Sequence, residues 1–139
     1  MRFQGTLLRN GRHWLAEVAV FDALTQGRTR TDALDMISDW FETMLGSTSA
    51  SVRAIAVTRT EFEVVAADAV GMISLLLRRQ RQKSGLSLAD AAARLGASSR
   101  NAYARYEQGR TVPTVAKLDE LLKAVAPDRD LLVGQSRAA

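Results

Sequence analysis

The first 68 residues combine a strand-like pattern with one helical pattern. Phe3–Leu8 leads to the pair Asn10-Gly11, a strong β-hairpin signal because both residues tolerate a positive φ. Between residues 14 and 20, Trp, Ala and Val at even positions alternate with other residues, which is the period of a strand with one better-buried face. A short third strand is predicted to end at Gly27, where glycine would give the backbone the freedom to leave the sheet.

A helix with a clear beginning and end is predicted next. Thr29 or Thr31 can cap its first turn, and Gly46 stands where helices commonly end. Its apolar residues recur at helical spacing, at Leu34, Ile37, Phe41, Met44 and Leu45. After a small polar linker at residues 47–51, β-type composition returns at Val52–Thr58 and Phe62–Ala67. Residues 1–68 are therefore predicted to form a small antiparallel sheet with one helix.

From residue 69 onward the pattern becomes helical. Val70–Lys83 forms the first segment, and Ser87 begins a short second helix, with Asp90 placed to complete a capping box. A third helix is predicted from Ser98 or Ser99, and a fourth after Pro113. This is the pattern of a helix-turn-helix with a supporting helix on each side. The whole chain is thus predicted to be α+β, with an all-α domain at residues 69–139 following the sheet domain.

Charge separates the same two halves. Residues 1–68 carry seven arginines and nine acidic residues, for a formal charge of −2, whereas residues 69–139 carry twelve Lys or Arg and six acidic residues, for +6. The total of +4 is the sum of these two values and conceals the difference between them. A basic half indicates a polyanionic partner, and we expect the acidic half not to meet DNA.

Composition excludes several chemistries. The chain has no cysteine, which excludes disulfides and thiol catalysis, and His13 is its single histidine, so no multi-histidine metal site can form. It has no apolar run of membrane-spanning length and no signal-peptide pattern at the start. We expect a cytoplasmic protein with no metal, no cofactor, no catalytic residues and no membrane association. A metal-dependent nuclease is an alternative, with Glu17 and Asp22 as the only strand-side carboxylates for it.

The second half resembles the Xre/Cro type of helix-turn-helix repressor. The segments that carry the resemblance are Gly85–Gly96, Arg105–Thr114 and the pair Lys117-Leu118. Between Gly96 and Arg105 this chain has one residue more than the commonest family spacing, which leaves open which residues of the third helix face the DNA groove.

The first half resembles the HicB antitoxins of HicAB toxin–antitoxin pairs. The segments Thr25–Thr29 and Asp32–Met36, after two leading strands, carry this resemblance. It implies a truncated ribonuclease-H-like fold that covers a small ribonuclease toxin of the HicA type, and some members of the family append an Xre-type domain. The two resemblances occur here in that order.

Candidate DNA contacts follow from side-chain chemistry. Arg100 suits guanine and Asn101 suits adenine, whereas serines near helix starts suit phosphates. The basic residues near Lys83 are either phosphate contacts or a solvated helix end. Glu107 is expected to be structural, paired with a nearby arginine. The candidate DNA-contacting residues are Arg81, Lys83, Ser87, Ser98, Ser99, Arg100, Asn101, Tyr103 and Arg105.

The acidic residues of the first-half helix share one side. They are Asp32, Asp35, Asp39 and Glu42. They form either a solvated face or a docking surface for a basic protein such as the HicA-like toxin.

Two functional hypotheses follow. The first is an antitoxin that binds the toxin and represses its own operon through operator DNA. The second is a stand-alone transcription regulator whose first domain senses a ligand or oligomerises. Both imply a homodimer or a higher homo-oligomer, because helix-turn-helix proteins usually read two half-sites.

Overall fold

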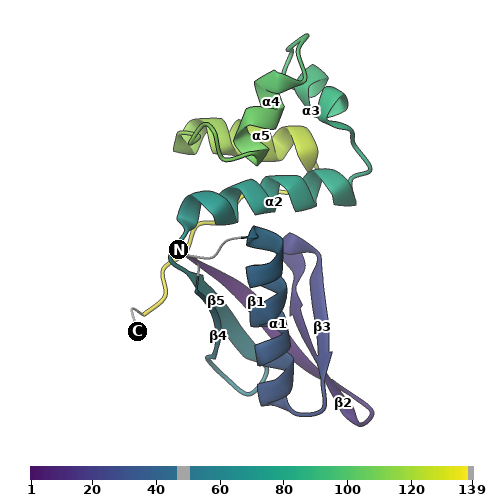
Figure 1. The fold of residues 1–139 in the computed structure, drawn as a ribbon, viewed down its shortest axis with the longest axis vertical. Helices are drawn as coiled ribbons and strands as arrows, with labels where there is room; N and C mark the ends of the chain where they lie inside the picture. Colours follow the sequence, from purple (N-terminus) through teal and green to yellow (C-terminus); the bar gives the residue numbers. More distant parts are fainter. Residues whose placement is uncertain (47–50, 138–139) are drawn as a thin grey trace. The chain divides into compact units, whose positions relative to one another are not determined.

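The computed structural model describes residues 1–46 and 51–137. The chain forms two compact units, Met1–Met72 and Ile73–Ala139 (Figure 1). The first unit is a sheet with a helix and the second is helical, so the predicted α+β class is confirmed. Most of the predicted linker lies outside the described residues.

A five-stranded antiparallel sheet forms the first unit, in the order β3-β2-β1-β5-β4. Gly11 has a φ of +60° in the turn between the first two strands, which confirms the hairpin predicted from Asn10-Gly11. A single 3-10 turn, Ala19–Phe21, leads from β2 to β3. The strands are β1 (Arg2–Asn10), β2 (His13–Val18), β3 (Ala23–Gly27), β4 (Val52–Ala56) and β5 (Glu61–Ala66).

Helix α1 (Arg30–Leu45) packs on one face of this sheet. Thr29 is its cap, because the Thr29 hydroxyl oxygen accepts a hydrogen bond of 3.0 Å from the Asp32 amide, and Gly46 ends it with a φ of +61°. The core contains a chain of edge-to-face aromatic contacts that joins Phe3, Phe21 and Phe41. The sheet is therefore buried on its α1 face.

Gly27 is required for a different reason from the predicted one. Its φ is not positive, so the residue is not needed for backbone freedom. Instead, a Cβ at this position would overlap the backbone nitrogen of Ala33 and atoms of Asp32 in the first turn of α1. A glycine here lets β3 and the start of α1 approach each other closely.

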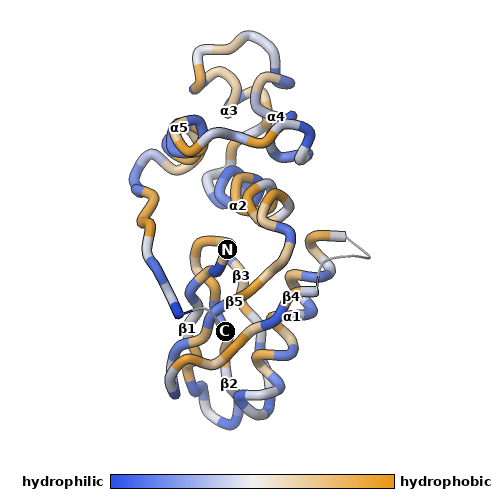
Figure 2. The backbone as a smooth tube through the Cα atoms, turned by 90° about the vertical axis from the view of Figure 1, so that its left-hand side faces the viewer, coloured by the Kyte–Doolittle hydropathy of each residue, from blue (hydrophilic) through white to orange (hydrophobic). Residues whose placement is uncertain are grey.

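Four helices belong to the second part of the chain. They are α2 (Ala69–Lys83), α3 (Leu88–Arg94), α4 (Asn101–Glu107) and α5 (Val115–Val125). Figure 2 shows hydrophobic and hydrophilic segments alternating along α2 and α5, as amphipathic helices require. The buried core of this unit consists of Leu77, Ala91, Ala92, Tyr103, Tyr106, Leu121 and Val125. No helix in the described part of the chain is long and apolar enough to span a membrane.

Gly27→Ala tests the close approach of β3 and α1. We expect a loss of about 3 kcal/mol in the free energy of unfolding of the first unit, because the new Cβ meets backbone atoms that cannot rotate away. Gly11→Ala is the matched control, since it adds strain of only about 1 kcal/mol at a positive φ where nothing lies within 4 Å. Urea unfolding followed by circular dichroism measures both. Equal losses for the two variants would contradict the explanation.

Candidate nucleic-acid interface

The turn between α3 and α4 is built by small residues and a capped helix start. The Ser87 hydroxyl oxygen accepts a hydrogen bond of 3.0 Å from the Asp90 amide, and the Ser87 amide donates one of 2.9 Å to the Asp90 carboxylate. This is the predicted capping box, and the hydrogen bonds from Ser87 lower the pKa of Asp90. Ala91 and Ala92 are buried, so α3 packs closely against its neighbours, and Gly96 turns the chain with a φ of +76°.

One face of α4 is exposed to solvent. Asn101, Arg105 and Gln108 follow one another at helical spacing and are all exposed, whereas Tyr103 and Tyr106 on the opposite side are buried. Three further exposed residues, Ser98, Ser99 and Arg100, precede the helix. The exposed face of α4 (Asn101, Arg105 and Gln108, with residues 98–100 before them) is the surface that this unit can present to a DNA groove.

Tyr103 is not part of this surface, which corrects its prediction as a DNA contact. Its side chain is fully buried, and its hydroxyl donates a hydrogen bond of 3.2 Å to the Leu77 carbonyl of α2. Burial raises the pKa of Tyr103, so its hydroxyl keeps its proton. With Tyr103 turned inward, the rotation of α4 that the sequence left open is settled.

Arg81 is also corrected, from a phosphate contact to a structural residue. Its guanidinium pairs with the Glu107 carboxylate through Nε at 2.6 Å and Nη2 at 3.1 Å, and its Nη1 donates a hydrogen bond of 2.8 Å to the Leu86 carbonyl. Only 14% of the Arg81 side chain and 7% of the Glu107 side chain are exposed. The hydrogen bond to Glu107 raises the pKa of Arg81. The structural role predicted for Glu107 is confirmed.

The other candidates are exposed, and their contacts with DNA stay predictions. They are Lys83, Ser87, Ser98, Ser99, Arg100, Asn101 and Arg105. Arg105 is held beside Tyr106, with its guanidinium 5.0 Å from the ring centroid and a hydrogen bond of 3.3 Å to the Tyr106 hydroxyl. Sequence reasoning missed Gln108, although its position seven residues after Asn101 places it on the same helix face.

In the first unit, α1 presents the predicted acidic side to solvent. Asp32, Asp35, Asp39 and Glu42 are all exposed, and Met36 lies among them with 49% of its surface exposed. Glu42 has a structural contact as well, because its carboxylate accepts a hydrogen bond of 3.3 Å from the Val52 amide. We call these five residues the acidic face of α1.

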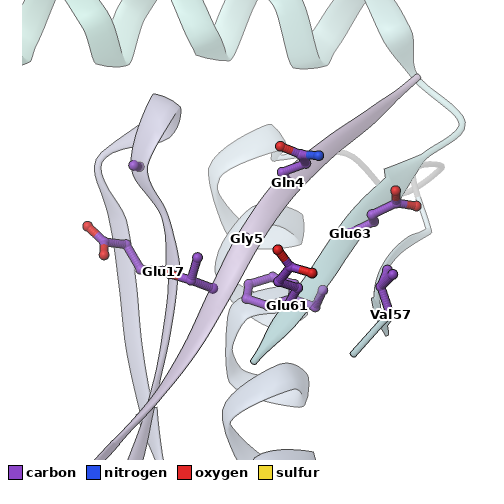
Figure 3. A pocket seen from close by; sticks show the side chains of 9 residues that line it. Gln4, Gly5, Glu17, Val57, Glu61 and Glu63 are labelled. Atoms are coloured by element: carbon purple, nitrogen blue, oxygen red, sulfur yellow. The ribbon is translucent and has the colours of Figure 1, made fainter. Parts of the chain in front are cut away.

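The sheet face opposite α1 carries a shallow pocket lined by Gln4, Glu17, Glu61 and Glu63, among others (Figure 3). Glu17 is one of the two strand-side carboxylates predicted for a nuclease, and Glu61 and the largely buried Glu63 of β5 line the same pocket although the sequence pattern did not single them out. The Glu63 carboxylate is paired with Arg2 at 2.6 Å. Within residues 1–46 and 51–137, no three acidic or histidine side chains are grouped so that they could hold a metal ion.

Arg81→Ala tests the structural role of the Arg81–Glu107 pair. We expect it to lower the free energy of unfolding of the second unit by about 2 to 3 kcal/mol, because it leaves the Glu107 carboxylate buried without its partner. The double variant Arg81→Ala/Glu107→Ala should recover part of this loss, and Lys123→Ala, which breaks an exposed pair with Asp119, should leave the unfolding midpoint unchanged. Thermal unfolding measures all three. An unaltered midpoint for Arg81→Ala would contradict the assignment.

One comparison with known proteins agrees with this geometry. Residues 73–132 match the family model of a helix-turn-helix domain. The comparison with curated proteins gave no match. The matched segment includes α3, α4 and α5, with the exposed face of α4 at its centre. The C-terminal unit is therefore a helix-turn-helix DNA-binding domain, which indicates a transcriptional regulator.

Proposed function

We propose that the protein is a sequence-specific repressor that reads operator DNA with α4. The observation that carries this proposal is the exposed face of α4, which places Arg100, Asn101 and Arg105 in solvent while Tyr103 and Tyr106 anchor the helix to the core. Arginine pairs with guanine and asparagine with adenine through two hydrogen bonds each, so this face has the donors and acceptors that base reading needs.

Phosphate contacts would fix the position of the domain on the duplex. Residues 69–139 carry a formal charge of +6, and Ser98 and Ser99 stand directly before α4, where a hydroxyl can donate to a backbone phosphate. A homodimer would place two such helices on two half-sites of an operator. No catalytic step and no cofactor belong to this proposal.

Arg100→Ala and Asn101→Ala test the reading of bases. Each is expected to reduce discrimination at one base pair by about 1 to 3 kcal/mol while non-specific binding is retained. Lys123→Ala, on the exposed side of α5 and paired with Asp119, is the matched control. Gel retardation on the promoter of the protein's own gene, and on single-base variants of it, measures the effect. Absence of any salt-dependent retardation by the wild-type protein would refute the repressor function.

A second proposed activity is neutralisation of a small basic toxin of the HicA type by the first unit. The acidic face of α1 supports it, because Met36 supplies an exposed apolar side chain next to a stripe of carboxylates. Protein interfaces commonly combine an apolar centre with a polar rim, and opposite charge steers the encounter. Together with the repressor function, this would make the protein a cytoplasmic antitoxin that represses its own operon.

The pair Asp35→Lys and Asp39→Lys tests toxin binding. When the protein is co-expressed with the product of the adjacent reading frame, the double variant should lose co-purification, because it reverses the charge of the face that would meet a basic partner. Glu17→Lys, an exposed acidic residue on the opposite face of the sheet, is the control and should still co-purify. If the wild-type protein does not co-purify with that product, the stand-alone regulator becomes the better hypothesis.

A further inference from the structure

Positive charge in the first unit is concentrated at one end, although the unit as a whole is acidic. Three turns meet at this end: the β1–β2 hairpin, the β3–α1 connection and the β4–β5 turn (Figure 1). Five of the seven arginines among residues 1–68 lie on or beside these turns. We call them the hairpin-end arginines, and they are Arg9, Arg12, Arg28, Arg30 and Arg59.

Trp14 and two backbone carbonyls hold part of this cluster in place. The guanidinium carbons of Arg9 and Arg30 lie 5.9 Å and 5.8 Å from the centroid of the Trp14 ring. Arg9 also donates from Nε to the Gly11 carbonyl at 3.2 Å, and Arg30 donates from Nη2 to the Thr58 carbonyl at 3.0 Å. Because Trp14 pairs with Gly27 across the sheet, these contacts tie all three turns together.

The hairpin-end arginines have no acidic partners. Within the described ranges, 1–46 and 51–137, none of the five forms an ion pair, whereas Arg2 in the same unit pairs with Glu63. Four of them are exposed, and the half-buried Arg30 has an Nε with no hydrogen-bond partner among those residues. The positive charge is therefore available to an external anion.

The exposed residues around these arginines favour phosphate over a protein surface. Beside the arginines, the exposed positions in and flanking the three turns are mostly polar: Asn10, Gly11, His13, Thr29, Thr58 and Thr60, with the carboxylates of Asp32 and Glu61 at the edges. Leu8 and Val57 are the exposed large apolar side chains there. Protein interfaces commonly have a larger apolar centre. Hydroxyls and guanidinium groups, in contrast, are the side chains that commonly bind nucleic-acid phosphates.

We propose that the hairpin end of the first unit is a second nucleic-acid-binding surface, which contacts the phosphate backbone without reading bases. This surface differs from the exposed face of α4 and from the acidic face of α1. It also reverses the expectation that the acidic half avoids nucleic acid, because net charge does not describe a unit whose charges are segregated.

The test uses the full chain and removes positive charge first from the exposed face of α4 and then from the hairpin-end arginines. In a background with Arg100→Glu and Arg105→Glu, we expect residual, salt-dependent binding to a mixed-sequence DNA duplex or a mixed-sequence RNA strand, measured by fluorescence anisotropy. Adding Arg12→Gln, Arg28→Gln and Arg59→Gln should weaken this binding at least about tenfold and reduce the slope of log K against log salt by about 2 to 3. The two probes show which nucleic acid the surface prefers.

The controls separate charge from folding. Arg12, Arg28 and Arg59 are exposed, so their replacement should leave the unfolding midpoint unchanged. Arg53→Gln removes an exposed arginine on β4 outside the cluster and should leave the salt slope unchanged. The proposal is refuted if the α4-deficient background binds neither probe, or if the triple change does not alter its binding. Operator recognition by the wild-type protein is measured in a separate experiment. The repressor function and the second nucleic-acid-binding surface can therefore be refuted independently of each other.

Discussion

The orientation of α4 depends on how Tyr103 and Glu107 are tied to α2. The buried Tyr103 hydroxyl donates a hydrogen bond to the Leu77 carbonyl. One turn later, the Glu107 carboxylate forms an ion pair with the Arg81 guanidinium. Both anchors lie on one side of α4, so the opposite side must face solvent. A helix of seven residues has too few hydrogen bonds to be stable alone, and its position is therefore set by this packing.

The two halves of the chain use charge in different ways. In the helix-turn-helix unit, Arg81 forms a largely buried ion pair with Glu107, whereas Arg100 and Arg105 are exposed. In the sheet unit the carboxylates of α1 lie along one helix side and the arginines gather at the turns. Segregation of this kind gives a small unit two surfaces of opposite sign, and a single value of net charge conceals both.

Much of the fold could be predicted from sequence because its signals are local. The Asn10-Gly11 turn, the Thr29 cap and the Ser87–Asp90 capping box each depend on residues within four positions of one another. The errors concern contacts between distant segments. Arg81 looked like a solvated basic helix end because its partner lies 26 residues away, and the role of Gly27 depends on the helix that packs on it. Similarly, the hairpin-end arginines lie in segments that are far apart in the sequence, and they come close together only because the fold brings the three turns to one end of the sheet.

The capping box of α3 has a consequence for how a duplex can approach this unit. The amides at the start of α3, which in many proteins attract a phosphate, already have the carboxylate of Asp90 beside them, and the hydrogen bonds from Ser87 lower the pKa of Asp90 because they stabilise its charged form. An incoming phosphate would meet a like charge there. The cap that stabilises α3 therefore also makes its first turn a less favourable place for a DNA phosphate, which argues against the predicted contact at Ser87.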